Sequence, residues 1–469
     1  MTQVTLGIIG LLLLVGFWAL ILPRWRLGLE LYILFMPIAG AVELWLYPTP
    51  GAVLIKDVLF ATPAFIGFAI SGELGSALAG LPNSFGSIML LFVGLVLVQA
   101  LNPGGPGLLA VLIGLKVWLF YVPMILLGRA YVRDRASLLR LSHLMISLIW
   151  LPCMVGIIQW ILSLALGYQY AISLFYGVAA RAATQNFSQF DNGLMRIPAT
   201  FSFPAQYLNY ILCMFVPLLG CTMIDTKQIW QILRSLSLPL LCVAGFMSGT
   251  RAAFLMIPLM LLTYYMLRRG AVGILWTGLL MAGLFAVVLS ISGIDPIGLF
   301  HMETDLTQSY TVEQAGTIEH ALQLTWIGRG VGSDTGAARL ATNDPEEFNV
   351  FESYYAKTIA ELGLFGLVAV GLFQVYLFLW AVRLISHVGK SPTAPYAGAM
   401  AACFLGFLIY NYKGVIIDFD PANMLYWLFA GVLFSLPTVE AVELQHGEFV
   451  ARGKAFAFLR SGASLESGA

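Results

Sequence analysis

The chain has 469 residues, of which 59% are hydrophobic and only 10% are charged, and its formal net charge is zero. A soluble domain typically carries about 25% charged residues, so the composition excludes a soluble enzyme, a nucleic-acid-binding protein and a disordered scaffold. An apolar run of about 20 residues crosses a bilayer, and the apolar residues present would build roughly 13 such runs. The composition therefore predicts an all-α, polytopic membrane protein.

Hydropathy along the chain predicts about 13 membrane segments. They cover approximately residues 5–22, 27–47, 53–71, 86–101, 108–128, 141–166, 205–223, 235–249, 252–267, 271–291, 353–381, 396–416 and 421–437. The neighbouring pieces 235–249 and 252–267 are short enough to form a single re-entrant hairpin instead. No internal repeat or low-complexity linker divides the chain, so residues 1–437 are predicted to form one helical transmembrane domain, followed by a tail, 438–469.

The start of the chain and its basic residues predict an orientation. The apolar run 6–22 is followed by Pro-Arg-Trp-Arg at 23–26, with no basic stretch before it and no small-residue cleavage site, so we expect a membrane helix and not a removable signal peptide. Most basic residues, among them Arg24, Arg129 and Arg268, fall in alternate short loops, and such loops are typically cytoplasmic. An odd number of segments then places the N-terminus outside and the tail in the cytoplasm.

Two long loops, about residues 167–204 and 292–352, fall on the predicted outer side. Loops of this length in a compact protein are usually functional or disordered, and aromatic residues punctuate both loops, as expected at a membrane interface. The second loop carries many acidic residues, together with His301 and His320, whose spacing does not suit a metal site. Chemistry or recognition is therefore expected at the outer face.

Four charged residues stand out on that side: Arg196, Arg251, Arg329 and Glu352. Charges near membrane depth are costly unless they are paired or hydrated, so each needs a reason. A guanidinium donates two parallel hydrogen bonds to a phosphate and stays charged at any relevant pH, so gathered arginines would make a diphosphate site. Glu352, at the predicted start of a helix, would be placed to act as a general base toward a hydroxyl.

Structural roles compete with these chemical ones. An interfacial arginine is often only a topology anchor, and Glu352 would also complement the dipole of its helix. Lys357 and Glu361 are four residues apart and would form a pair on one helix face. Lys116 lies within a predicted span and is expected to neutralise a group that the sequence does not identify.

Metal and cofactor chemistry find little support in the sequence. The five cysteines all lie inside apolar runs without metal or redox spacing, and we expect them to be small core residues. Glu43 and Asp57, near the first outer loop, are too far apart in the sequence to suggest a metal-binding pair. No nucleotide-binding loop occurs either. We therefore expect metal-independent chemistry with no cofactor and no nucleic-acid partner.

Four short motifs follow one another in the later part of the chain. The first is an arginine and a stretch that enters a helix: Arg196, Ala199, Thr200, Phe201 and Pro204. The second is the turn Ser248-Gly249-Thr250-Arg251, and the third is a glycine-rich stretch with Gly328, Gly330 and Gly332. The fourth opens the next long helix with Glu352-Ser353 and continues through Glu361, Gly363 and Gly366.

In this order the motifs resemble the signatures of the O-antigen ligase and Wzy-type polysaccharide polymerase superfamily. The resemblance is strongest over about residues 190–375, and the layout of many helices with one large late loop extends it over most of the chain. Ala199 stands where that family usually has glycine. Glu352-Ser353 stands where ligases typically have His-Asn, and this departure favours a chain polymerase over a ligase.

The resemblance implies a metal-independent glycosyltransferase of the GT-C type in the bacterial inner membrane, joining undecaprenyl-diphosphate-linked oligosaccharide repeats on the periplasmic face. Arg196 and Arg251 would bind the diphosphate and stabilise the leaving group, and Glu352 would deprotonate the acceptor hydroxyl. Further residues expected to contact substrate are Arg329, Gly330, Ser353, Tyr354 and Lys357. Besides membrane lipid, a chain-length regulator and a flippase are plausible partners.

Three other functions remain as alternatives. An O-antigen ligase would transfer the glycan to a lipid A core. A lipid-linked oligosaccharide flippase, or another transporter, would need charged residues along a path across both leaflets, whereas the candidate residues here crowd toward the outside. A noncatalytic membrane scaffold is the third alternative.

Overall fold

The computed structural model describes residues 2–184, 195–292, 313–336, 351–388 and 391–462. Within these ranges the regular structure is helical, as expected where the bilayer offers no water to backbone groups. The α-helices are α1 (Thr2–Ile21), α2 (Trp25–Trp45), α3 (Thr62–Ile70), α4 (Leu74–Ala79), α5 (Asn83–Ala100), α6 (Leu108–Leu119), α7 (Met124–Tyr131), α8 (Arg135–Leu166), α9 (Tyr168–Tyr176), α10 (Ala180–Thr184), α11 (Pro204–Gly220), α12 (Gln228–Met247), α13 (Ala252–Ser292), α15 (Gln314–Leu324), α16 (Tyr354–Val388), α17 (Ala394–Tyr410) and α18 (Ala422–Gly462). Shorter helical pieces are η1 (Leu22–Arg24), η2 (Pro50–Leu54), η3 (Asp57–Ala61) and η8 (Ile416–Asp418).

By length and composition, 8 helical stretches of the described chain could cross a membrane. They are Leu12–Trp45, Gly51–Ile70, Asn83–Ala100, Leu108–Tyr131, Arg135–Leu166, Gln228–Met247, Tyr354–His387 and Ala422–Val442. The prediction of an all-α, polytopic membrane protein is therefore confirmed. The predicted number of segments, about 13, is higher than the number of such stretches in the described chain.

The difference in number has identifiable causes. The predicted segments 5–22 and 27–47 form one run, because only the 3₁₀ turn η1 separates α1 from α2. The segments 252–267 and 271–291 both fall within the range of α13. Helices α11 and α17 have 17 residues each, and 17 residues span only about 26 Å, less than the hydrocarbon thickness. Helix α12 begins at Gln228 and is long enough to cross, so it is not the short arm of a re-entrant hairpin.

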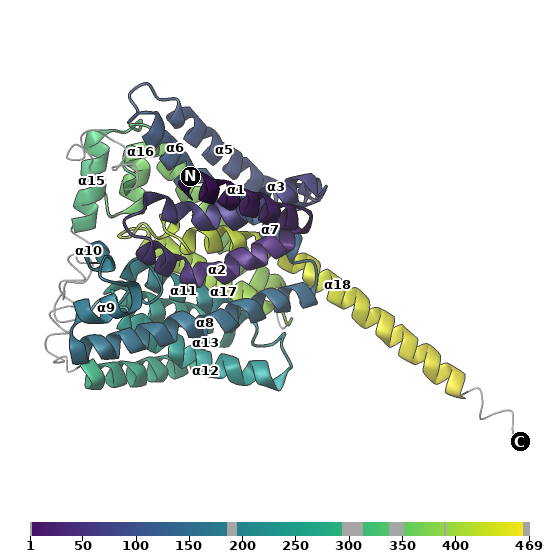
Figure 1. The fold of residues 1–469 in the computed structure, drawn as a ribbon. Coiled ribbons are helices and arrows are strands. Elements are labelled where there is room, and N and C mark those ends of the chain that lie inside the picture. The colour runs from purple at the N-terminus through teal and green to yellow at the C-terminus, as the bar shows by residue number, and fades with distance from the viewer. Residues whose placement is uncertain (1, 185–194, 293–312, 337–350, 389–390, 463–469) are drawn as a thin grey trace, which may run out of the picture.

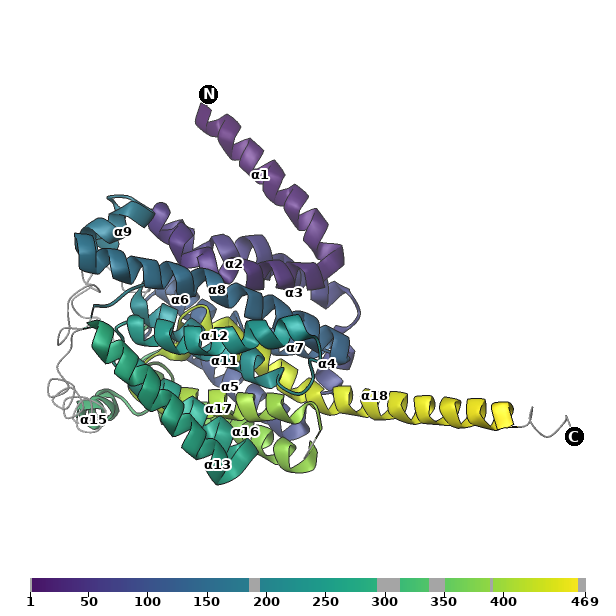
Figure 2. The same cartoon turned by 90° about the horizontal axis from the view of Figure 1, so that it is seen from below.

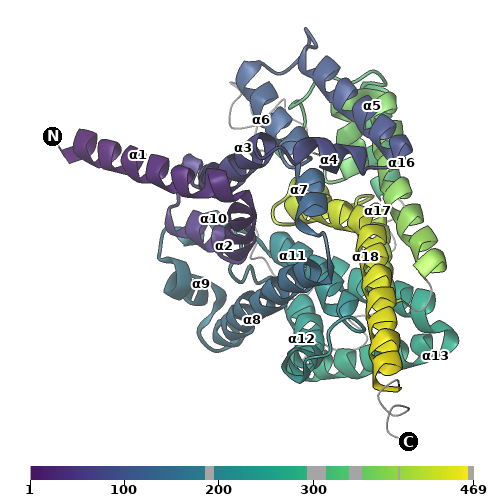
Figure 3. The ribbon, with the colours of Figure 1, turned by 90° about the vertical axis from the view of Figure 1, so that its right-hand side faces the viewer.

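The helices form a bundle with two different ends. The short helices α9, α10 and α15 cover one end, which we call the loop end, and α18 leaves the bundle at the opposite end (Figure 1). Helix α1 also projects from the bundle, in another direction (Figure 2). Figure 3 views the molecule from the side to which α18 extends, with α11 and α17 surrounded by other helices. Helix α18 continues through Gly462, past the predicted start of the tail at 438.

Helices α11 and α17 are almost completely buried and lie at the centre of the bundle. Small residues along α17 let its neighbours approach closely, as is usual where helices pack in a membrane. A Cβ atom on Gly398 would lie 3.1 Å from the Arg268 side chain of α13, and one on Gly220 of α11 would lie 2.5 Å from the Tyr396 ring. Glycine at these positions thus sets the spacing of the central helices.

Helices α7 and α18 cross with their backbones in contact. A Cβ atom on Gly431 would lie 2.1 Å from the Ile125 carbonyl oxygen, and one on Gly128 would lie 2.5 Å from the Leu428 carbonyl oxygen. Each helix therefore presents a glycine to the backbone of the other. This crossing attaches α18 to the bundle before α18 extends away from it.

A capping box starts the long helix α8. The Asp134 carboxylate accepts a 2.8 Å hydrogen bond from the Ser137 backbone N–H, and the Ser137 hydroxyl accepts one of 3.1 Å from the Asp134 N–H. These bonds satisfy N–H groups that have no partner within the helix. They also hold the pKa of Asp134 below its usual range.

We predict that Asp134→Ala destabilises the protein by about 1 kcal/mol, because the first turn of α8 loses its acceptor. Asp134→Asn keeps a side-chain oxygen and should melt close to the wild type. The carboxylate's contribution is complete above the unfolded pKa of about 4 and fades as the pH falls toward the lowered folded value. The difference in melting temperature between Asp134→Ala and wild type in detergent should therefore be larger at pH 7 than at acidic pH. A constant difference would contradict this account.

Candidate functional site

The first motif lies in segment 195–203, which is clamped between α2 and the turn 248–251. The Ala41 N–H donates a 2.8 Å hydrogen bond to the Thr200 carbonyl, and the Ile197 N–H donates one of 3.2 Å to the Ser248 carbonyl. Helix α2 comes so close that a Cβ atom on Gly40 would lie 2.3 Å from the Phe201 Cα. The segment is therefore held through its backbone on both sides.

Gly249 brings the first and second motifs into direct contact. It has a φ of +66°, and a Cβ atom there would lie 2.1 Å from the Met195 carbonyl oxygen and 2.9 Å from the Arg196 Cα. The turn therefore packs on the backbone that carries Arg196, and Arg251 follows two residues later. Both arginines are half-buried. Two guanidinium-bearing residues that are far apart in the chain are thus attached to the same backbone contact.

Ala199 has the left-handed backbone conformation that glycine adopts most easily, with a φ of 51°. Its carbonyl oxygen accepts hydrogen bonds from Gln159 Nε2, at 3.1 Å, and from the Tyr176 hydroxyl. A left-handed residue other than glycine costs about 1–2 kcal/mol, which the surrounding contacts must offset. Ala199 therefore occupies a backbone position that favours glycine.

Several buried polar atoms around the two motifs have no hydrogen-bond partner in the described part of the chain. They include Arg196 Nε, Thr200 Oγ1, Thr250 Oγ1 and both side-chain atoms of Asn411. Arg196 also lies close enough to Tyr168 of α9 and Tyr410 of α17 for its positive charge to interact with their phenol groups. Buried polar groups normally have partners, so this region is suited to a polar ligand or to ordered water.

The third motif and the residues just before it pack against a break in α16. Gly363 has a φ of 75°, and its interruption of the helix admits the chain at 326–327: the Leu364 N–H donates a 2.9 Å hydrogen bond to the Trp326 carbonyl. The backbone N–H of Arg329 donates one of 2.7 Å to the Ala360 carbonyl. The third and fourth motifs therefore pack together as a backbone assembly.

The Glu361 carboxylate is fully buried and gathers four donors. Trp118 Nε1 of α6 lies 2.6 Å from it, the Gly332 and Asp334 N–H groups lie at 2.9 and 3.0 Å, and the Thr335 hydroxyl lies at 2.8 Å. Glu361 is thus saturated by α6 and by the segment 326–335. This arrangement fastens the third motif to the bundle.

Lys357 finds its hydrogen-bonded partner outside its own helix. Its ammonium group pairs with the Asp418 carboxylate of η8 and lies 4.9 Å from the centre of the Trp118 ring. The predicted Lys357–Glu361 helix pair is therefore replaced by a pair with a residue far along the chain, because the Glu361 carboxylate is bound by other donors.

The other residues predicted to bind substrate differ in their exposure. Arg329 and Glu352 are exposed, whereas Gly330, Ser353 and Tyr354 are buried. The Ser353 carbonyl accepts the Lys357 N–H at 2.9 Å, and the Tyr354 N–H donates to the Asn411 and Gly414 carbonyls at 3.1 Å each. The buried residues thus join the start of α16 to the end of α17.

Glu352 lies in an open hollow of about 540 Å³ beside α15. The hollow is lined by Glu313, Gln314, Gly316, Thr317, His320, Phe351 and Glu352. The rings of His320 and Phe351 meet edge to face, with centroids 5.9 Å apart. The hollow thus combines carboxylates and an amide with an aromatic ring. His301 lies outside the described residues.

The structure also contains a cluster of ion pairs that was not predicted from the sequence. Lys56 Nζ lies 3.1 Å from the Asp420 carboxylate and 3.5 Å from that of Glu43, and Lys116 Nζ lies 2.8 Å from the Asp57 carboxylate. Asp57 is thus the group that Lys116 neutralises, and Glu43 meets a lysine. The tyrosines that join the cluster are Tyr32 and Tyr121, with hydroxyls 3.1 and 2.7 Å from Asp57 Oδ1. The adjacent charges at 56–57, inside an apolar region, were its signal.

No protein-family model matches the chain, and no curated protein sequence matches it. What the structure establishes is a polytopic, helical membrane protein whose four motif segments meet in two backbone-linked pairs.

We predict that Gly249→Ala separates the first two motifs and strongly destabilises the protein, because the new methyl group would overlap the Met195 carbonyl. Gly72→Ala is the matched control. Gly72 also has a positive φ, of +78°, but a Cβ atom there meets nothing within 4 Å, so that variant should lose only about 1–2 kcal/mol. Melting curves of the two variants in detergent give the comparison. Equal losses would show that the contact contributes nothing.

Asp334 generates a prediction about pH. Its carboxylate accepts the Phe351 N–H at 3.2 Å, and burial, reinforced by the charge of Glu361, raises the pKa of Asp334 to about 8. The folded chain therefore holds a proton that the unfolded chain releases above its usual pKa of about 4, so stability from this group is lost as the pH rises to about 8. Asp334→Asn cannot ionise, and its melting temperature relative to wild type should rise steadily from pH 5 to pH 8. A difference independent of pH would refute the assignment.

Proposed function

We propose that the protein is a membrane glycosyltransferase of the polysaccharide-polymerase type, joining undecaprenyl-diphosphate-linked oligosaccharide repeats at the periplasmic face. The observation that carries the proposal is the backbone contact at Gly249, which attaches Arg196 and Arg251 to one place. Two half-buried arginines beside unpartnered polar atoms suit a diphosphate, because each guanidinium binds phosphate oxygens through a planar fork.

The two arginines would act on the leaving group. Cleavage of the bond between the sugar and the diphosphate leaves negative charge on the lipid diphosphate, and fixed cations stabilise that charge in the transition state. Segment 195–203 is held by α2 and by the turn 248–251, so the position of Arg196 is set before substrate arrives. Such preorganisation is what electrostatic catalysis requires.

Glu352 would act on the acceptor. Its carboxylate lies in the open hollow beside α15, where a sugar hydroxyl can reach it, and it would accept the hydroxyl proton as the oxygen attacks. The Phe351 ring and the polar groups of the hollow suit a saccharide, which presents both apolar faces and hydroxyls. Arg329 is exposed on segment 326–335 and would assist either substrate.

Two connections join the arginine region to the start of α16. The charge of Arg196 acts on Tyr410, and the next residue, Asn411, receives the Tyr354 N–H through its carbonyl. The ring of Phe203 meets that of Phe419 edge to face, next to the Asp418 that binds Lys357. Donor and acceptor groups would thus be held on one connected surface.

We predict that purified protein in nanodiscs, given lipid-diphosphate-linked oligosaccharide without nucleotide sugar or metal, produces a ladder of longer lipid-linked chains. Arg251→Ala should lower the rate at least about 100-fold, as expected for loss of a group that stabilises developing charge. Glu352→Gln should lower it by about 100-fold or more through loss of the base. Products are separated by size.

Arg24→Ala is the matched control for charge, because Arg24 is exposed, in η1, and outside all four motifs. It should polymerise at the wild-type rate. Full activity of Arg251→Ala would contradict the proposed role of Arg251 in binding the diphosphate. Full activity of Glu352→Gln would contradict the proposed role of Glu352 as the general base. Transfer only to an added lipid A core would favour the ligase, and no reaction with authentic substrate would favour transport, tested by lipid translocation in vesicles.

A further inference from the structure

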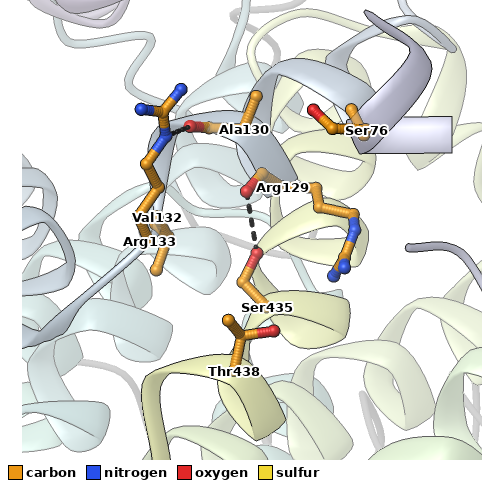
Figure 4. Close-up of a pocket in the computed structure, with 8 residues that line it drawn as sticks. Ser76, Arg129, Ala130, Val132, Arg133, Ser435 and Thr438 are labelled. Carbon is orange, nitrogen blue, oxygen red and sulfur yellow. Dashed lines mark hydrogen bonds between the residues drawn. The ribbon is translucent and has the colours of Figure 1, made fainter. Parts of the chain in front are cut away.

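A smaller cavity, of about 200 Å³, lies between α4, α7 and α18. Figure 4 shows side chains that line it. Two arginines and three hydroxyl-bearing residues are among the side chains that line it: Arg129, Arg133, Ser76, Ser435 and Thr438. None of them belongs to the four motifs. The cavity therefore needs an explanation of its own.

Arg129 is half-buried and makes one hydrogen bond, from Nη1 to the Phe434 carbonyl oxygen at 2.5 Å. A guanidinium has five N–H donors, so this bond leaves most of them for other acceptors. Within the described residues no carboxylate pairs with Arg129. In Figure 4 its side chain extends on the opposite side from that of Arg133.

A carboxylate next to the cavity, that of Glu73, already pairs with two arginines. Glu73 accepts a hydrogen bond from Arg26 Nη2 at 2.7 Å and another from Arg133 Nη2 at 2.5 Å. Burial alone would raise the pKa of Glu73, but the two arginines hold it below its usual range, so the group stays ionised. The lining itself carries two arginines and no carboxylate, so the cavity is net positive.

The cavity also lies near the ends of two candidate membrane spans. Arg129 is near the end of the candidate span Leu108–Tyr131, and Ser435 lies toward the end of Ala422–Val442. On the side of α3 and α4, Ile70 and Leu78 are 70% and 50% exposed, as suits contact with acyl chains. Polar groups at the ends of spans with apolar residues beside them match the layout of a phospholipid.

We propose that this cavity binds the phosphate group of an anionic membrane phospholipid, with Arg129 as its principal ligand. The guanidinium fork matches phosphate oxygens, and the exposed Thr438 lines the same cavity with its hydroxyl. A volume of about 200 Å³ equals roughly six or seven water molecules, enough for a phosphate and its ester oxygens. Free phosphate offers the same chemistry, and the exposed apolar neighbours favour the lipid.

The test measures thermal unfolding of delipidated protein in neutral detergent. The additions are phosphatidylglycerol, phosphatidylcholine or inorganic phosphate. A ligand that binds only the folded state raises the melting temperature with concentration. We expect phosphatidylglycerol to give such a rise at micromolar concentration, and Arg129→Gln to require at least tenfold more lipid for the same rise. Arg383→Gln, on α16, is the control and should respond as the wild type does.

Thr438→Val supplies a second variant, because Thr438 is exposed and its loss does not threaten folding. It should weaken the response several-fold even if Arg129→Gln fails to fold. The proposal would be overturned if both variants showed the wild-type rise in melting temperature with phosphatidylglycerol. If Arg129→Gln does not fold, a wild-type rise from Thr438→Val alone would overturn it. An equal rise with phosphatidylcholine would overturn it as well. A rise with inorganic phosphate that matches the lipid would keep the phosphate site and overturn its lipid source.

Discussion

The buried carboxylate of Glu361 organises the loop end of the molecule. A buried charge destabilises a fold unless donors surround it, and here the donors come from separate parts of the chain: Trp118 on α6, and Gly332, Asp334 and Thr335 on the segment 326–335. Without the donor from α6, or without those from segment 326–335, the Glu361 carboxylate would lack part of its hydrogen bonds. Helix α6, segment 326–335 and the start of α16 are therefore expected to become ordered together, as one unit.

The segment 411–421 plays a similar part for two buried lysines, Lys56 and Lys357. Three consecutive residues, Asp418, Phe419 and Asp420, contact in turn Lys357, Phe203 and Lys56. This short stretch thereby joins α16, the first motif and the polypeptide before α3. A buried ion pair adds little net stability, but breaking one is costly, so such pairs favour one arrangement of the helices over others. The ion pairs in the region of the proposed chemistry therefore contribute mainly by selecting one packing arrangement of the helices, and less by adding stability.

The all-helical membrane fold could be predicted from composition and hydropathy, because apolar runs and helix length are local properties. So could the ends of several helices, which charged and proline residues mark. Which segments merge was not predictable, since η1 leaves α1 and α2 in one run. Nor were the partners of buried charges: Lys116 reaches Asp57, and Lys357 reaches Asp418 in place of Glu361 on its own helix. Such pairings are properties of the packed bundle: the sequence marks the charged residues in apolar regions, but it does not identify their partners.

The proposed chemistry divides between a rigid half and an open half. Arg196 and Arg251 are attached to backbone that glycine holds in van der Waals contact, whereas Glu352 stands exposed in a hollow. Charge stabilisation gains most from groups that do not reorganise during the reaction, and polymer acceptors of growing length need an entrance that does not close. A polymerase that extends chains of changing length would need this combination, a fixed site for the constant diphosphate and an open one for the variable glycan.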